Sequence, residues 1–226
     1  HHDTPHDAAP RLNRCTSVQK GRYLDGTMQP TARRGFVCPP QWRTSVASVT
    51  INGRPRQNEA GVIPERFEEA LLSLRNAPRS RGLLMEEVPA PKKLAPYSAA
   101  LTAETVEAVG TTPIATGRFV VLHDPNGQDA WDGDFRIVVQ ARARIDDEVG
   151  MDPVFESAAW SWLTDGLEDS RAGYRALVGT VTRVLSETFG GLTLTDSCAH
   201  AEIRASWTPT TTHLGPHLTA WHELLL

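Results

Sequence analysis

Apolar and polar residues alternate with a period of two along Asp134–Ile145. The odd positions carry Phe135, Ile137, Val139, Ala141, Ala143 and Ile145, and the even positions carry Arg136, Val138, Gln140, Arg142 and Arg144. Successive side chains of a β-strand point to opposite faces of its sheet. The pattern therefore predicts a long strand in a sheet with one covered apolar face and one face largely open to water.

Five further segments have the composition or the alternation of strands. They are Leu83–Val88, Leu94–Leu101, Gly117–His123, Gly179–Phe189 and Ala199–Thr208. The residues Asp124–Gly127 read Asp-Pro-Asn-Gly, which predicts the turn that joins Gly117–His123 to the long strand. The sequence of Thr102–Glu107 does not clearly favour any secondary structure.

Three segments carry apolar residues at helical spacing. The first begins near Pro64, where a missing N–H costs a helix nothing, and ends at Asn76–Pro78. The second follows Asp152 and Pro153, with Phe155, Ala158, Ala159, Trp162, Leu163 and Leu167 on one face. The third carries Leu214, Leu218, Trp221 and Leu225. Strands joined by short turns, with helices between runs of strands, predict an α+β fold. We expect a mostly antiparallel sheet of about five to six strands with the helices packed on one face.

The charge balance divides the chain near residue 61. Residues 1–61 hold nine Lys or Arg and four Asp or Glu, whereas residues 62–226 hold fourteen and twenty-three, a balance of -9. The first part is also interrupted by proline and glycine, and only Val46–Asn52 alternates like a strand. We expect residues 1–61 to be a disordered extension or the product of a wrongly assigned start, and residues 62–226 to be a single domain.

The three cysteines Cys15, Cys38 and Cys198 are too few and too widely spaced for a disulfide framework. No apolar run approaches the roughly 18 residues of a membrane span, and no signal peptide is evident. We therefore expect a cytoplasmic protein with reduced thiols and no membrane association.

Several motifs resemble those of one known family. They lie in Leu94–Leu101, Thr116–Trp131, Trp160–Leu163, Gly179–Gly190 and Ala201–Pro209. In their order and spacing they resemble an actinobacterial family catalogued as a domain of unknown function, number 3000, over about residues 62–226. The resemblance implies a small cytoplasmic protein and brings no activity with it.

The sequence contains no nucleophile elbow, no glycine-rich phosphate loop and no HExxH motif. His1, His2 and His6 lack the spacing of a metal site, and so do His213, His217 and His222, which we interpret as surface histidines. We therefore expect no metal and no cofactor. His123 and Asp124 could form an acid–base pair, but neighbours on a strand point to opposite faces, so a turn aspartate beside a hydrogen-bonded histidine is the preferred interpretation.

The candidate binding residues are arginines and tryptophans. Arg136, Arg142 and Arg144 share one face of the long strand, and Arg204 lies on the polar side of another strand beside Glu202. Guanidinium groups suit phosphates and carboxylates, although cross-strand pairing with Glu187 and Glu202 is the preferred interpretation here. Trp131 in the hairpin loop and Trp160 outside the main helical stripe could be exposed, and an exposed tryptophan can anchor a partner.

Three functions stay open at this point. The first is a non-catalytic interaction module that binds another protein through the sheet face and Trp131 or Trp160. The second is an accessory protein that binds RNA or another anion through Arg136, Arg142, Arg144 and Arg204. The third is an enzyme of unrecognised class whose site combines His123, Asp124, Arg183 and Glu187.

Overall fold

The computed structural model describes residues 63–91, 93–186 and 199–226. Six strands form one antiparallel sheet in the order β1-β2-β5-β6-β8-β7. Their bounds are β1 Leu83–Val88, β2 Tyr97–Thr105, β5 Ala115–Gln128, β6 Gly133–Ile145, β7 Tyr174–Val184 and β8 Ala199–Pro209. A small separate hairpin is formed by β3 (Ala108–Val109) and β4 (Thr112–Pro113).

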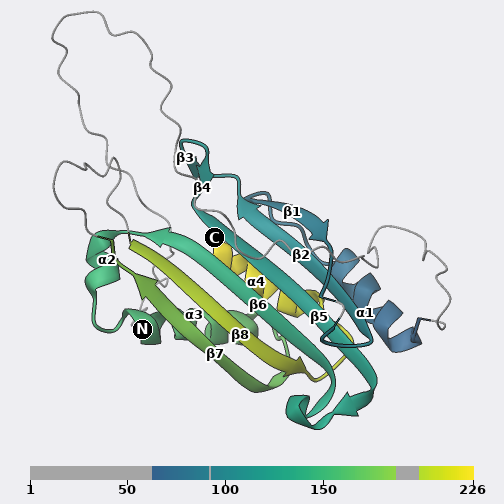
Figure 1. The fold of residues 1–226 in the computed structure, drawn as a ribbon. Coiled ribbons are helices and arrows are strands. Elements are labelled where there is room, and N and C mark those ends of the chain that lie inside the picture. Colours follow the sequence, from purple (N-terminus) through teal and green to yellow (C-terminus); the bar gives the residue numbers. More distant parts are fainter. Residues whose placement is uncertain (1–62, 92, 187–198) are drawn as a thin grey trace, which may run out of the picture.

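The helices lie behind the sheet in the view of Figure 1. They are α1 (Glu65–Arg75), α2 (Asp147–Met151), α3 (Phe155–Asp169) and α4 (Gly215–Leu225). Helix α4 packs on β5 and β6, while α3 packs on α4 and β7. The fold is therefore α+β, with an antiparallel sheet backed by helices, as the alternation predicts. No helix in the described ranges has both the length and the apolar character to cross a membrane.

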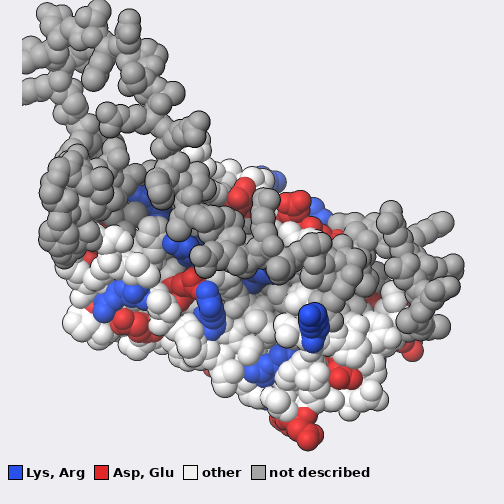
Figure 2. All heavy atoms as spheres, viewed as in Figure 1, with Lys and Arg blue, Asp and Glu red and all other residues white. Residues whose placement is uncertain are grey.

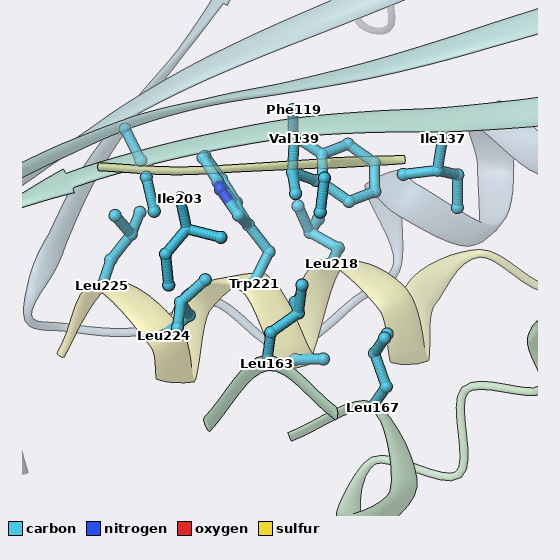
Figure 3. Packing of buried hydrophobic residues seen from close by; sticks show 14 of the residues in the cluster. Phe119, Ile137, Val139, Leu163, Leu167, Ile203, Leu218, Trp221, Leu224 and Leu225 are labelled. Carbon is cyan, nitrogen blue, oxygen red and sulfur yellow. The ribbon is translucent and has the colours of Figure 1, made fainter. Parts of the chain in front are cut away.

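The apolar residues of β6 face the helices and form the centre of the core. The register places Ile137 between Val121 and Trp207, and Val139 between Phe119 and Ala205. Figure 3 shows Phe119, Ile137 and Val139 above Leu218 and Trp221 of α4 and Leu163 of α3. All of them are buried. Burial of such side chains contributes about 1.5–3 kcal/mol each, so this layer accounts for much of the stability.

Trp221 fixes the distance between α4 and the sheet. Its indole N–H donates a hydrogen bond to the Gln140 carbonyl of β6 at 3.2 Å. Its ring lies against Gly117 of β5, where a Cβ atom would come within 2.7 Å of the Trp221 ring and 2.9 Å of the Gln140 carbonyl oxygen. We infer that glycine is required at position 117 because any side chain would force the helix away from the sheet.

The opposite face of the sheet, which we call the open face, is only partly open. Ala90 and Ala95 of the β1–β2 connection pack on Ala100, Val120 and Leu122, and all five are buried. This second cluster covers the part of the open face near β2 and β5. The expectation of a largely wet face therefore holds only for the remaining part.

The end of β5 and the position of the following turn differ from the sequence prediction. Asp124–Gly127 does not form the hairpin turn, because these residues lie within β5, where the register with β6 is shifted between His123 and Gln128. The chain reverses later, at the 3-10 turn Asp129–Trp131, with Asp132 at φ 54°. The Asp124 carboxylate accepts hydrogen bonds from the Asn126 backbone N–H and the Gln128 side chain, and so stabilises an irregular strand instead of a turn.

Other boundaries moved by a few residues. The predicted strand Leu94–Leu101 is β2, which begins at Tyr97 and continues through Thr105. Strand β7 begins at Tyr174 instead of Gly179, and the short helix α2 was not predicted. The predicted strand Val46–Asn52 lies outside the described residues.

The interpretation of His217 and His222 as surface histidines was wrong. Both lie on the buried side of α4, with exposed fractions of 1% and 2%. Nδ1 of His217 lies 3.0 Å from the indole nitrogen of Trp207, which donates to it, and Nε2 of His222 lies 2.8 Å from the Met85 sulfur. Their burial lowers the pKa of each histidine from 6.5 to about 4, and nearby His213 adds a smaller contribution at His217.

These two histidines predict a loss of stability in mild acid. Between pH 6.5 and about 4 the unfolded chain binds protons at His217 and His222 that the folded chain excludes. The free energy of unfolding should therefore be highest above pH 6.5 and fall by about 3 kcal/mol per histidine towards pH 4. Urea unfolding across this range measures the loss.

The variant His222→Leu tests the cause. It removes one of the two proton sites within the same buried volume, so its stability should fall less steeply between pH 6.5 and 4 than that of the wild type. His213→Gln, which removes an exposed histidine, is the control and should keep a slope close to the wild-type one. Equal slopes for all three proteins would contradict the assignment.

Candidate functional site

The part of the open face that no other described residue covers consists of three cross-strand rows on β5, β6 and β8. Gln140 lies opposite Arg118 and Arg204, Arg142 lies opposite Thr116 and Glu202, and Arg144 lies opposite His200. Directly paired residues of an antiparallel sheet point to the same face. The register therefore places Arg136, Arg142, Arg144 and Arg204 on one face, as the alternation predicts. In Figure 2 basic and acidic side chains are interspersed on the visible part of this face.

Arg136 is a structural residue. Its exposed fraction is 7%, and burial lowers the pKa of its guanidinium. One guanidinium nitrogen donates to the Ala176 carbonyl (2.9 Å) and the Thr208 hydroxyl (3.1 Å), and the other donates to the carbonyl (3.1 Å) and hydroxyl (2.7 Å) of Ser206. Ala176 has a positive φ of 51° inside the irregular part of β7. Arg136 therefore holds this part of β7 against β8, and it should be removed from the candidate binding residues.

Arg142 and Arg144 create a positive potential at the end of the face. The side chain of Arg142 is exposed and makes no hydrogen bond or ion pair within the described part of the chain, and Arg144 is half-buried. The pKa of His200 is lowered first by burial and then by the charges of Arg142 and Arg144. Both cations therefore act on the His200 side chain, which lies opposite Arg144, and an anion bound at this end of the face would be attracted by both.

Arg204 and Arg118 are engaged by neighbouring groups. The guanidinium of Arg204 forms an ion pair with Glu202, and Gln140 donates to the same carboxylate oxygen at 3.0 Å. Arg118 donates to the Pro89 carbonyl at 2.8 Å, and burial lowers its pKa. Arg204 is therefore paired with Glu202, but within its own strand and not across strands as predicted. Glu187 lies outside the described residues.

Trp131 and Trp160, which the sequence suggested as exposed anchors for a partner, are both half-buried. Trp131 packs against the second cluster, and its carbonyl accepts a hydrogen bond from Thr208. Trp160 packs against the main core, and its ring lies where a Cβ atom on Gly179 would come within 2.7 Å. Both rings are occupied by contacts within the domain, which leaves them little free surface for a partner.

Two residues of the enzyme hypothesis, His123 and Arg183, lie far apart, and a third, Glu187, lies outside the described residues. His123 is 1% exposed and stacks on Phe135 at 4.1 Å, with its Nδ1 3.0 Å from the Asp134 carbonyl. Arg183 instead contacts the carbonyls of Gly150 and Asp152 and forms an ion pair with Glu156 at 3.1 Å. On β6, the rows that contain His123 and Arg183 are those of Phe135 and Ala143. At about 3.3 Å per residue these rows are roughly 26 Å apart.

A family model described as a protein of unknown function, DUF3000, matches residues 63–226. The chain belongs to the DUF3000 family. No curated protein and no solved structure matched it. The matched range spans the whole sheet and all four helices, so the resemblance in the sequence is confirmed, and the function has to be argued from the face itself.

A small pocket of the DUF3000 domain lies between α1, β1 and α4. Its volume is about 120 Å³, and it is lined by Leu74, Arg75, Ala77, Arg79, Met85, Glu86, Glu87, Leu101 and Leu218. Sites for small molecules usually measure about 300–1,000 Å³, so this pocket would hold no more than one side chain. Among the described residues no group of three His, Cys, Asp or Glu side chains is placed to hold a metal ion.

Sequence reasoning missed Arg118 and His200. Arg118 was counted only as part of a strand, yet its position relative to Gly117 and Phe119 already assigns it to the polar face. His200 was not considered because nothing in one sequence places it beside Arg144. That placement follows from the register between β6 and β8.

The different roles of two arginines on one strand predict different costs of substitution. Arg136→Ala should destabilise the domain by about 2–4 kcal/mol because it removes a buried guanidinium and leaves its acceptors on Ser206, Thr208 and Ala176 without that donor. Arg142→Ala, six positions along the same face, should change the free energy of unfolding by less than about 0.5 kcal/mol. Chemical denaturation of both variants measures the difference, and equal effects would show that Arg136 has no such structural role.

Proposed function

We propose that this domain is a non-catalytic interaction module that binds an acidic segment of a partner protein in the cytoplasm. The binding surface is the uncovered part of the open face, centred on Arg142 and Arg144. The observation that supports it most is the pair of arginine charges acting on His200, together with an exposed Arg142 that has no partner among the described residues. A carboxylate of a partner would pair with the exposed Arg142 guanidinium.

The mixture of groups on this face favours a protein over a nucleic acid. Glu202, Gln140 and Thr116 lie in the same rows as the arginines and offer both acceptors and donors for backbone and side-chain groups of a partner. The three rows hold no Phe, Tyr or Trp side chain on β5, β6 or β8, and their one aromatic ring is the imidazole of His200. Single-stranded RNA is usually bound by stacking several bases on such rings. The balance of -9 over residues 62–226 also opposes a long polyanion.

An RNA- or anion-binding accessory is the second candidate. The same arginine pair favours it, because guanidinium groups bind phosphate as readily as carboxylate. The two candidates differ in length dependence: RNA binding should strengthen with strand length, whereas an acidic segment needs to span only the rows from Gln140 to Arg144.

A fluorescence-anisotropy titration separates the candidates. The probes are a labelled oligoglutamate peptide and a labelled oligouridine of equal charge, each titrated with the domain at low and moderate salt. Under the proposal the peptide binds with the higher affinity, and the affinity falls with salt because the contacts are ionic.

The double variant Arg142→Ala/Arg144→Ala should weaken peptide binding about tenfold, because each exposed ionic contact contributes up to about 1 kcal/mol. The matched control is Arg75→Ala/Arg79→Ala, which removes two exposed arginines near α1 and should leave the affinity unchanged. Tighter binding of oligouridine would favour the second candidate. If neither probe binds at low salt, both candidates are wrong.

A further inference from the structure

The two outer edges of the sheet are protected to different degrees. Strand β1 has six residues, includes Glu86 and Glu87, and is followed by Pro89. Strand β7 has eleven residues, with no charged residue between Arg175 and Arg183, and in the described part of the chain it pairs only with β8. Proteins usually protect edge strands with charges, prolines or short length. The middle of β7 has none of these.

The exposed side chains along the regular part of β7 are uncharged valines and threonines. Its register with β8 is shifted between Arg175 and Val178 and is then continuous from Val178 to Val184. Val178 and Val184, at the two ends of this regular part, are 58% and 48% exposed. They point to the same face of the sheet as Thr180 and Thr182, which are also exposed.

The segment Val178–Val184 is complementary to itself when it runs antiparallel to a second copy about Val181. Val178 then lies opposite Val184 of the partner subunit, and Thr180 lies opposite Thr182 of the partner subunit. Val181 meets its own counterpart on the symmetry axis. Arg183 lies opposite Gly179 of the partner subunit, where no side chain opposes it. Valine pairs and threonine pairs across strands each contribute about 0.2–1 kcal/mol.

A neighbouring register fits less well. Centring the pair on Gly179 would place Arg175 directly opposite Arg183 of the partner subunit, and like charges in opposite positions are destabilising. The register about Val181 avoids this repulsion, and it also uses the whole regular part of β7. These two properties favour a second copy of this chain as the occupant of the edge.

We propose that the protein forms a two-fold symmetric dimer in which β7 pairs with β7 of the second copy, so that two six-stranded sheets become one continuous sheet. Paired residues point to the same face, so the open faces of both copies lie on one side and the helices on the other. The proposal does not depend on anion binding, because Arg142 and Arg144 lie on β6, away from the paired edge.

Light scattering coupled to size exclusion tests the dimer. The wild type should have twice the mass of the chain, and the mass should fall on dilution. Val178→Lys/Val184→Lys places lysines opposite each other twice and should give a monomer. Val178→Lys/Val184→Glu places each new lysine opposite a glutamate and should keep the dimer. Circular dichroism checks that every variant is folded.

The matched control is Leu84→Lys/Leu94→Lys, which changes two residues of similar exposure, 58% and 57%, away from β7. It should remain dimeric. A monomeric wild type at high concentration would overturn the proposal, and so would a Val178→Lys/Val184→Lys variant that stays dimeric.

Disulfide formation tests the register. In a background with Cys15, Cys38 and Cys198 changed to serine, Val178→Cys and Val184→Cys are prepared as separate proteins. Residues directly opposite on antiparallel strands are about 4.5–5.5 Å apart, within reach of a disulfide. A mixture of the two proteins should cross-link on oxidation, whereas each protein alone should not. Cross-linking of the single proteins, or none in the mixture, would contradict this register.

Discussion

The contact between α4 and the apolar face of β5 and β6 is the interaction on which the rest of the structure depends. Trp221 lies in the space that Gly117 leaves free, and its indole N–H is bound to the Gln140 carbonyl. This contact determines which face of β6 is covered by α4. Because successive side chains alternate along a strand, Arg142 and Arg144 then point to the opposite face. The position of the candidate site is therefore a consequence of how the core is packed.

The long strand could be predicted from the sequence because one of its faces is buried along its whole length. A shift of one residue would move every apolar side chain to solvent, so the alternation defines both the strand and its orientation. The same argument fails at Asp124–Gly127, where residues typical of a turn form an irregular part of β5. A local turn signal cannot distinguish a chain reversal from a bulge, because both need residues that tolerate unusual backbone angles.

The roles of individual polar residues could be predicted only in part. Arg136 and Arg142 occupy equivalent positions in the alternating pattern, yet one is buried among the acceptors of β7 and β8 and the other is exposed. The difference arises from the irregular backbone at Ala176, which no pattern in β6 records. His217 and His222 were misplaced for a related reason. The partners that make their burial tolerable are Trp207 on β8 and Met85 on β1. The helical pattern of α4 alone does not show that these strands lie against it.

Val138 of β6 marks the boundary between the covered and the uncovered parts of the open face. Val138 is the apolar exception among the polar even positions, and it lies opposite Val120 and packs against the second cluster. Towards Arg136 the face is occupied by internal contacts, whereas towards Arg144 it carries charge. The ligand that we propose for this face would therefore contact the end beyond Val138, where the exposed Arg142 and the half-buried Arg144 lie beside Gln140.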